Sequence, residues 1–517
     1  DRSRYYLRYR YTFRKNISFG FTGEKDPGEE FFAGTQKGFD FNSAHLLYSG
    51  RGVLNTLIIG DYQARFGQGL TMWSGLSFGK SSYVMQVKRV ESGLRPYTSV
   101  DENLFMRGAA ATVALGPVKL TAFYSQKQVD GNLTVVDTLD AELIGSFTSL
   151  QQSGFHRTQG ELSDKDAVGE RYIGGNLSFQ KKRFHIGATG FVADYDAQFT
   201  RNTQLYNQFE LDTSHYAVGG IDYAYGKNNW SFFGETSISD SKGIATVNGI
   251  MLALHPKLSV AVVQRHFDKE FQNLQANVFA EGSKPANESG IYAGLQADLN
   301  SRMSFSLYYD QFKFPWMRFL TDAPSVGHEY LAQFNYRPKR GYEFYVRYRQ
   351  KLKGRNASDP EAIIDYPTSE VRQNFRIYAS YPVSKSLKLK SRVEWVQYEL
   401  QGNAIENGFM LYQDLIFKKL EWPISFAVRY ALFDTESYNA RVYAYETDLL
   451  YSWSIPAYYS RGSRFYLMAK IDVYRKIDLW LRYSVWKYND RDVISSGLNE
   501  IEGNLKSDFK AQLRWRF

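Results

Sequence analysis

The chain has 517 residues, no cysteine and a formal net charge of +9, and 16% of its residues are aromatic. Without cysteine, disulfides, thiolate metal sites and cysteine nucleophiles are excluded. The mean hydropathy of −0.43 and the lack of any apolar run near ~18 residues exclude a helical membrane protein. A hydrophobic content of 43% excludes a disordered chain. Because the chain opens directly on a strand-like pattern, we expect a mature chain or one whose upstream part is absent.

The main pattern is an alternation of apolar and polar residues along most of the chain. In residues 5–14, 342–349 and 387–394, most alternate positions are apolar, and those between them are mostly polar or charged. Because successive side chains of a strand point to opposite sides, each segment has one apolar and one charged face. The pattern therefore predicts an all-β protein.

The alternating segments indicate about 24 strands, within a range of 22–26, and bacterial single-chain barrels have an even number of strands. In chain order, the predicted strands are residues 3–14, 17–24, 39–49, 53–65, 105–114, 118–129, 170–180, 183–196, 213–226, 228–239, 242–255, 257–267, 288–299, 301–314, 326–338, 341–353, 369–383, 385–400, 406–418, 423–434, 440–454, 463–474, 476–489 and 504–517.

Strand length distinguishes a membrane barrel from a soluble β-sandwich. Soluble strands are usually about 5–6 residues long, whereas many of these are about twice that length, with short turns such as 381–385, 418–423 and 474–476. A tilted strand needs about 9–11 residues to cross a bilayer, and in lipid only helices and closed barrels satisfy every backbone group. We therefore predict that residues 1–517 form one transmembrane antiparallel β-barrel in a bacterial outer membrane. A soluble β-solenoid or β-sandwich is the alternative.

The last strand carries a candidate assembly signal. Leu513, Trp515 and the terminal Phe517 alternate with charged or polar residues. An amphipathic last strand that ends on Phe resembles the signal read by the barrel-assembly machinery of bacteria. The expected partners are therefore outer-membrane lipid and, during biogenesis, that machinery. The alternative is an ordinary last strand without a signal.

Two long segments could fill the wide lumen that a barrel of this size leaves. Residues 66–104 are rich in glycine and aromatic residues, and small residues permit close approach of the backbone. Residues 130–169 are polar and acidic. Each is predicted either to fold inward or to be an ordinary extracellular loop. The candidate plug residues are Phe66, Gly67, Gly69, Trp73 and Gly75.

The predicted lumen face is basic. With a net charge of +9, a water-filled lumen of this kind would favour anions. The alternative is that these cations pair with acids on neighbouring strands or on a plug and serve structure alone. The candidate electrostatic lining is Arg8, Arg10, Arg347, Arg349, Lys388, Lys390, Arg392, Arg482, Arg514 and Arg516.

No motif predicts a metal or a cofactor. Residues 75–81 resemble a phosphate-binding loop but have three residues between the glycines instead of four, and no helical pattern follows. None of the seven histidines has a partner at metal-ligand spacing. Several acids lack the spacing of a calcium loop; they are Asp137, Asp140, Glu142, Glu161, Asp164 and Asp166.

No catalytic residues are predicted either. A lipase or a protease of the barrel type needs Ser, His and acidic groups that converge in space. Every barrel of this size contains those residue types, and their order in the sequence does not bring them together. We therefore expect that the protein is not an enzyme.

Several stretches resemble a poorly characterised group of large outer-membrane barrels from Bacteroidota. Some members carry helix-hairpin-helix repeats upstream of the barrel, like those of DNA-uptake proteins. The resemblance implies a barrel fold and carries no assigned chemistry, and no such repeat pattern is visible in this chain. The stretches are IIGDYQARFGQGL (58–70), GLRPYTSVDEN (93–103), RGA (107–109), IPAYY (455–459), DLWLRY (478–483) and SGLNEI (496–501).

The leading functional hypothesis is a transport or translocation channel with a basic lumen that residues 66–104 partly occlude. The second is a non-conducting barrel that scaffolds a larger envelope complex for secretion or assembly, with other envelope proteins or lipoproteins as partners. The third, a DNA-handling barrel, rests only on the resemblance. From this chain alone, nucleic acid is not an expected partner.

Overall fold

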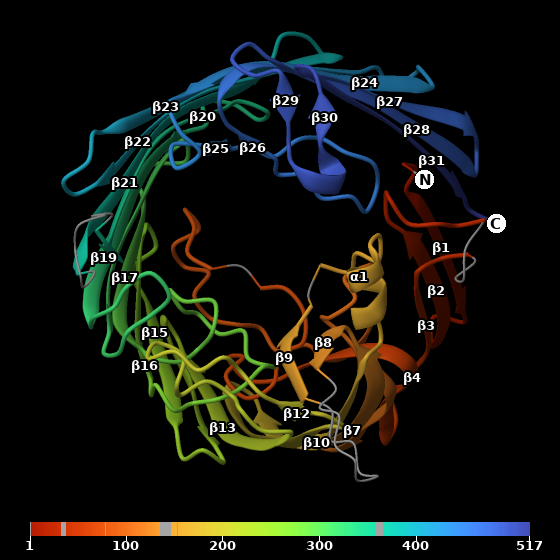
Figure 1. Ribbon diagram of the computed structural model, residues 1–517, viewed down its shortest axis with the longest axis vertical. Helices are drawn as coiled ribbons and strands as arrows, with labels where there is room; N and C mark the ends of the chain where they lie inside the picture. Colours follow the sequence, from red (N-terminus) through yellow and green to blue (C-terminus); the bar gives the residue numbers. More distant parts are fainter. Residues whose placement is uncertain (1, 33–37, 78, 135–145, 152, 358–365) are drawn as a thin grey trace. The chain divides into compact units, whose positions relative to one another are not determined.

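The computed structural model describes all residues except 1, 33–37, 78, 135–145, 152 and 358–365. Its main element is a 24-stranded sheet (Figure 1). The strands of this sheet are β1 (Tyr5–Phe13), β2 (Ile17–Lys25), β3 (Phe41–Ser49), β4 (Leu54–Arg65), β5 (Gly93–Pro96), β6 (Met106–Leu115), β7 (Val118–Val129), β10 (Val168–Lys181), β11 (Phe184–Tyr195), β13 (His215–Lys227), β14 (Trp230–Ser239), β15 (Ile244–His255), β16 (Leu258–Phe267), β17 (Glu288–Asp298), β18 (Met303–Phe314), β19 (Ser325–Tyr336), β20 (Glu343–Asn356), β21 (Pro367–Pro382), β22 (Leu387–Leu400), β23 (Glu406–Lys418), β24 (Ile424–Thr435), β27 (Arg461–Tyr474), β28 (Ile477–Tyr488) and β31 (Leu505–Trp515).

The remaining elements are short and lie in the connections. They are β8 (Gly131–Thr134), β9 (Ser146–Leu150), α1 (Gln159–Asp164), β12 (Gln198–Phe199), β25 (Val442–Tyr443), β26 (Ala457–Tyr458), β29 (Val493–Ile494), the 3₁₀ turn η1 (Gly497–Asn499) and β30 (Ile501–Glu502). In the described part of the chain, no helix has the length and apolar character needed to cross a membrane.

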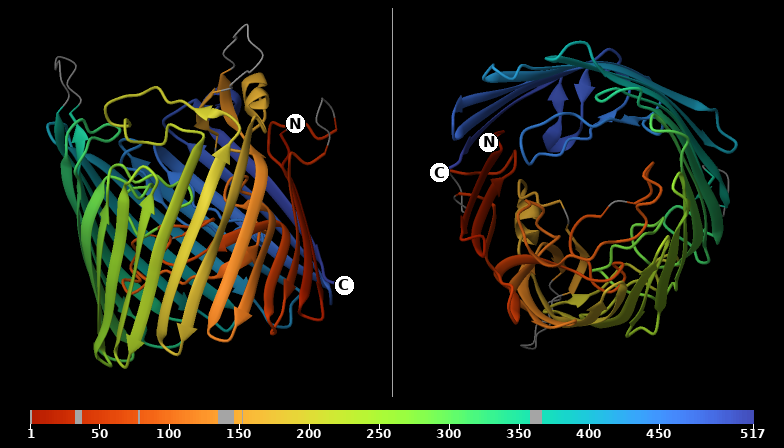
Figure 2. Two further views of the ribbon diagram at one scale, coloured as in Figure 1. Left: turned by 90° about the horizontal axis from the view of Figure 1, so that it is seen from below. Right: turned by 180° about the vertical axis from the view of Figure 1, so that it is seen from behind.

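The chain divides into two compact units, and each is described by itself. The first comprises residues 1–254, 260–293 and 312–319, and the second comprises residues 255–259, 294–311 and 320–517. Within each unit, strands that follow one another in the chain pair antiparallel, as β10 does with β11 and β22 with β23. In the first unit, Figure 2 shows long hairpins whose turns are short at one end. β1 pairs with β2 and β31 with β28, and closure of the sheet into a barrel stays a prediction.

The two faces of the sheet have the opposite polarity from those of a soluble sandwich. In β14, Phe232 and Ile238 are 40% and 50% exposed, whereas Glu235 is 2% exposed. In β23, Leu411 is 39% exposed, whereas Asp414 is 4% exposed. The apolar face of the sheet is thus exposed, and the polar face is buried. This is the arrangement of a strand with lipid on one side and a polar interior on the other.

Aromatic side chains flank the short turns. Tyr225 and Trp230 lie on either side of the turn between β13 and β14, with ring centroids 5.4 Å apart. Phe417 contacts Phe426 at 5.1 Å and Trp422 at 5.5 Å around the turn between β23 and β24. Such rings are typical of the interfacial girdles of outer-membrane barrels.

One predicted strand is wrong. Residues 440–454 alternate as expected, with Val442 and Glu446 buried and Tyr443 exposed, but only Val442–Tyr443 forms a strand, which pairs with β26. The segment is extended up to Asp448, turns at residues 449–451, and rests on the polar face of the sheet instead of joining it. The alternation indicates an extended chain with one apolar and one polar face. It does not distinguish a strand of the sheet from an extended segment that rests on the sheet. The sheet still has 24 strands because the four-residue β5, which was not predicted, takes part in it.

Candidate site on the polar face of the sheet

In the first unit, a segment between β4 and β6 is anchored to a buried carboxylate. This first docked segment, residues 66–104, places three backbone N–H groups on Glu235 of β14: those of Gln68, Leu70 and Thr71, at 2.5, 3.1 and 2.8 Å. The hydroxyl of Thr71 also bonds that of Ser237, two residues further along β14, at 2.5 Å. Hydrogen bonds that involve a charged group are about twice as strong as neutral ones, so this carboxylate is a strong anchor.

Glycine makes this close approach possible. Gly67 and Gly69 have φ of +57° and +87°, which side-chain-bearing residues rarely adopt. A Cβ on Gly67 would lie 2.6 Å from Glu235 Oε2, and one on Gly69 would lie 2.7 Å from the carbonyl oxygen of Asn277. The turn around the carboxylate therefore requires glycine at both positions.

Further polar contacts hold the first docked segment along its length. Asn273 Nδ2 donates to the carbonyl of Leu70 at 2.6 Å, and Trp73 N–H donates to the carbonyl of Gln275 at 2.8 Å. Lys80 Nζ pairs with Glu281 at 2.5 Å. Leu70, Thr71 and Met72 are fully buried, so the start of the segment is packed as well as hydrogen bonded.

The candidate plug residues all lie in this anchored stretch. Phe66 is buried and stacks on Phe123 of β7 with centroids 6.4 Å apart. Trp73 is buried beside Arg65, and Gly75 has a φ of +98°. Whether the segment plugs a lumen is not tested by these contacts and remains a prediction.

The same stretch contains a spacing that resembles a nucleophile elbow. Residues 75–79 read G-x-S-x-G, the pattern of hydrolases with a Ser nucleophile. Ser77 Oγ, however, bonds the side-chain oxygen of Asn277 at 2.6 Å. Among the described residues, no histidine is a hydrogen-bond partner of this serine. Its contact with Asn277 instead helps to hold the first docked segment in place.

In the second unit, wall arginines hold an extended segment by its backbone. This second docked segment, residues 439–450, is part of the connection between β24 and β27. It contains β25, which pairs with β26, and both strands lie inside the arc of β20–β24 (Figure 1). Carbonyls of alternate residues on an extended chain point the same way, and here they meet guanidinium groups from four strands of the sheet, β21, β22, β24 and β28. Arg372 of β21 donates to the carbonyls of Asn439 and Arg441 at 2.6 and 2.5 Å. Three further arginines each hold one carbonyl: Arg392 of β22 that of Tyr443 at 2.8 Å, Arg429 of β24 that of Tyr445 at 2.8 Å, and Arg482 of β28 that of Thr447 at 3.2 Å. We call these four arginines the arginine ladder.

Acids on the second docked segment complete these contacts. Glu446 is fully buried and accepts hydrogen bonds from Arg464, with an Nη2–Oε2 distance of 2.9 Å, and from Arg482. The hydroxyl of Tyr458 also donates to Glu446, at 2.8 Å. Asp448 accepts from Lys510 of β31 at 2.7 Å. Each of these acids has a cationic partner, which offsets the free-energy cost of removing both charges from water.

The apolar core of the second unit lies between this connection and the sheet. Val442, Ala444 and Tyr458 pack on side chains from β22, β23, β24 and β28. The cluster comprises Val396, Met410, Tyr412, Ala431, Phe433, Val442, Ala444, Tyr458, Trp486, Tyr488 and Ile494.

Most of the predicted lining residues of the second unit have polar partners. The exceptions are Lys388 and Lys390, neither of which forms an ion pair with an acid among the described residues. Lys390 lies opposite Asp414 in the register of β22 and β23. The partnered residues are Arg347 with Gln333 at 2.6 Å, Arg349 with Glu329 at 2.9 Å, Arg392 with Glu394 at 2.8 Å, Arg482 with Glu446, and Arg514 and Arg516 with Asp478 at 2.5 and 3.2 Å.

Other predicted residues fall in separate places. Arg8 and Arg10 lie on β1, opposite Thr22 and Gly20 of β2. They are not part of either docked segment. Leu513, Trp515 and Phe517 of the candidate assembly signal are 66%, 68% and 64% exposed, which suits side chains that face lipid.

The long polar loop, residues 130–169, contains β8, β9 and α1. The predicted acids Asp137, Asp140 and Glu142 lie outside the described residues. Glu161 caps α1 through the backbone N–H of Thr158, in a reciprocal arrangement with the Thr158 hydroxyl. This acid therefore has a structural role.

The bare apolar face determines the location of the protein. A large exposed apolar surface on a folded sheet requires lipid or a partner to cover it, and its alternation with a polar face matches transmembrane strands. The chain is an all-β protein of the bacterial outer membrane.

Comparisons with known proteins give only distant likenesses. No family model and no curated protein matches the chain. Among solved structures, OccK5 (OpdH) of Pseudomonas aeruginosa is 11% identical, covers 77% of this chain and 98% of its own, and has a TM-score of 0.32. The FpvA structure of P. aeruginosa bound to pyoverdine is 9% identical, with coverages of 99% and 69% and a TM-score of 0.43. The ferric yersiniabactin uptake receptor FyuA of Yersinia pestis is 8% identical, with coverages of 99% and 78% and a TM-score of 0.35. At these scores the likenesses carry no argument about substrate, and the resemblance to the Bacteroidota group stays a prediction.

Proposed function

We propose that this protein is a transport channel of the outer membrane that its two docked segments keep closed at rest. The sheet closes into a barrel in this proposal, and its polar face lines the passage. The observation that carries the proposal is that, in each unit, a connection leaves the rim and is fastened to the polar face by buried charges: Glu235 in one unit and the arginine ladder in the other.

The chemistry of the anchors favours a gate that can open. Glu235 and the arginine ladder bind mostly backbone N–H and carbonyl groups, and water can replace such partners when a segment moves away. A purely apolar seal would instead expose a bare core. Release of a segment would uncover a polar surface that suits an aqueous passage.

The ion pairs modify the predicted basic lining. Arg349, Arg392 and Arg514 are paired with acids, so fewer unpaired cations line the passage than the predicted basic lining contains. Lys388 and Lys390 are the candidates for a remaining anion preference.

Solute uptake by proteoliposomes tests the proposal. We expect slow uptake of potassium chloride and of a small neutral sugar with the wild-type chain, and uptake at least several-fold faster with Glu235→Gln and with Arg372→Ala. Glu210→Gln is the matched control for the first variant, because its carboxylate pairs with Lys284 on an exposed loop. Heat-modifiable migration on gels confirms that each variant is folded.

Two results would contradict the proposal. Wild-type uptake as fast as that of the variants would mean that the docked segments do not close the passage. Folded variants that stay as tight as the wild type would favour the non-conducting scaffold instead.

A further inference from the structure

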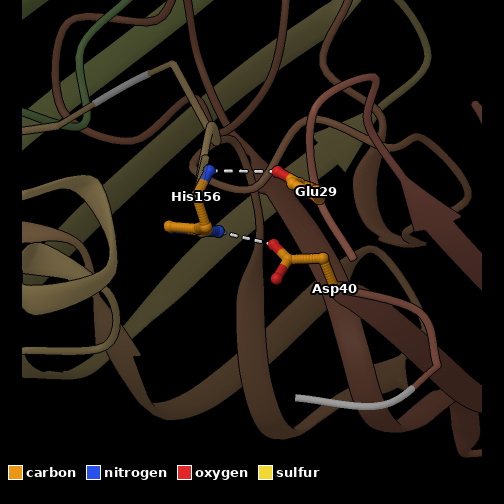
Figure 3. Close-up of side chains that lie close together, drawn as sticks. All are labelled: Glu29, Asp40 and His156. Atoms are coloured by element: carbon orange, nitrogen blue, oxygen red, sulfur yellow. Dashed lines mark hydrogen bonds and ion pairs between the residues drawn. The ribbon is translucent and has the colours of Figure 1, made fainter. Parts of the chain in front are cut away.

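A histidine in the long polar loop lies where this loop meets two other connections of the first unit, those between β2 and β3 and between β5 and β6. His156, which follows β9, is 5% exposed. Its Nδ1 lies 2.5 Å from Asp40 Oδ2, and its Nε2 lies 2.9 Å from Asp130 Oδ2. Figure 3 shows the ring directed at Asp40 and the backbone N–H of His156 directed at Glu29. A third carboxylate, that of Glu102, completes a group with Asp130 and His156 whose ligand atoms all lie within 4.8 Å of one another.

The two sides of the imidazole are not equivalent. On the Nδ1 side the carboxylates are already used: Glu29 accepts the backbone N–H groups of Asp26 and His156 at 2.8 and 3.0 Å, and Asp40 pairs with Lys165 at 2.5 Å. On the Nε2 side, the carboxylate of Glu102 has no hydrogen bond to any described residue. Among the described residues, a carboxylate without a hydrogen-bond partner therefore lies only on the Nε2 side.

We propose that His156 Nε2, Asp130 and Glu102 form a Zn²⁺ site. One imidazole nitrogen and two carboxylates are a donor set that zinc accepts at about 2.0–2.2 Å, with a fourth position open to water. Tetrahedral ligands at that distance lie about 3.4 Å apart. The Asp130–His156 pair at 2.9 Å needs to open by about 0.5 Å to reach that separation, and Glu102 needs to move inward.

The groups behind the three ligands are those that support a metal-binding histidine. Such a histidine usually donates its other ring N–H to a carboxylate, and Asp40 accepts at Nδ1 while Lys165 holds Asp40 in place. Asp130 is oriented in the same way, because its Oδ1 accepts the backbone N–H of Asp166 at 2.9 Å. Both ligands are therefore preoriented.

Charge balance favours a divalent cation. Lys165 neutralises Asp40. With the imidazole neutral and both carboxylates ionised, as metal binding requires, Asp130 and Glu102 supply the two negative charges that balance a divalent cation.

The site links segments that are far apart in the sequence. Asp40 precedes β3, Glu102 precedes β6, Asp130 follows β7 and His156 precedes α1. A bound metal would fasten the long polar loop to the connection between β5 and β6. This prediction concerns the connections and does not depend on whether the protein conducts.

Equilibrium dialysis of the purified full chain against Zn²⁺, followed by metal analysis, tests the site. We expect one Zn²⁺ per chain for the wild type and none for Glu102→Gln or His156→Gln at the concentration that fills the wild type. Asp40→Asn should bind about 10–100-fold more weakly, because only the support of the histidine is lost. Asp164→Asn is the matched control and should bind as the wild type does. It removes one charge from the same loop, at an acid outside the cluster.

Glu102→Gln keeps the proposal falsifiable even if His156→Gln misfolds, because no hydrogen bond of the described residues is lost with that carboxylate. The visible spectrum of the Co²⁺-substituted protein should show the intense bands of a four-coordinate ion, and these bands should vanish in Glu102→Gln. Wild-type protein that binds no Zn²⁺, or a Glu102→Gln variant that binds it equally well, would overturn the proposal. Binding of Ca²⁺ in preference to Zn²⁺ would also overturn it, because Ca²⁺ requires an oxygen shell of six or more ligands.

Discussion

At the scale of single residues, the unusual feature is that several charged side chains are buried as deeply as the apolar core. Glu446 and Arg482 are 0% and 1% exposed, and Arg265 is 1% exposed. The cost of removing such groups from water is recovered only when every partner is present. Glu446 and Arg482 therefore anchor the second docked segment, whereas Arg265 pairs with Glu288 of β17. Loss of one partner of such a buried pair destabilises the fold more than loss of both partners.

Glu446→Leu should destabilise the protein by about 3–5 kcal/mol, because Arg464 and Arg482 are then buried without their acid. Urea unfolding in lipid measures this change. Glu421→Leu, at a side chain that is 83% exposed, is the control and should stay within about 0.5 kcal/mol. Equal effects of the two substitutions would show that the buried network is not an anchor.

Gly69→Ala should loosen the first docked segment. The φ of +87° costs about 1–2 kcal/mol for alanine, and its Cβ would meet the carbonyl of Asn277. We expect faster proteolytic cleavage within residues 66–104. Gly79→Ala, in the same segment with open space around its Cβ, should be cleaved as slowly as the wild type. A protected Gly69→Ala variant would contradict this account of the turn.

At the scale of elements, the alternation predicts almost the whole sheet but not what rests on it. All predicted strands except 440–454 have counterparts in the sheet, because period-two patterning specifies which face is polar. The arginine ladder was not predictable, since its contacts join side chains to backbone carbonyls that carry no sequence signal. The Glu235 anchor is similar, as its three donors are backbone N–H groups.

The His156 cluster escaped prediction for a related reason. Its partners Asp40 and Asp130 are 116 and 26 residues away, so a search for metal-ligand spacing along the sequence cannot find it. The signal that was available is weaker. Asp40 lies at the start of the predicted strand 39–49 and Asp130 directly follows the predicted strand 118–129, but two other strands, β4 and β6, separate these strands in the sheet.

Arg372→Ala should release the N-terminal end of the second docked segment, because this one side chain holds the carbonyls of Asn439 and Arg441. Trypsin should then cleave after Arg441 several-fold faster, as fragment mapping would show. Arg461→Ala, which removes an arginine that is largely exposed and pairs with Asp434, should leave the cleavage rate unchanged. Unaltered cleavage in Arg372→Ala would mean that the remaining rungs hold the segment without it.

At the scale of the whole molecule, the bare apolar face requires that the strands lie in lipid. Leu411→Arg places a charge at the middle of β23 on that face and should cost about 2–4 kcal/mol of folding free energy in bilayers. Leu420→Arg, at a turn residue that is 96% exposed, should cost about 0–1 kcal/mol. If both substitutions cost equally little, the face is not embedded.

The central claim is that the two docked segments together keep a transport channel closed, and single-channel recording in a planar bilayer tests it most directly. The account predicts that the wild-type chain is silent or opens briefly, and that the double variant Glu235→Gln/Arg372→Ala gives long, large openings. A wild-type chain that conducts steadily at the level of the double variant would contradict closure at rest, and a folded double variant that never conducts would contradict transport itself.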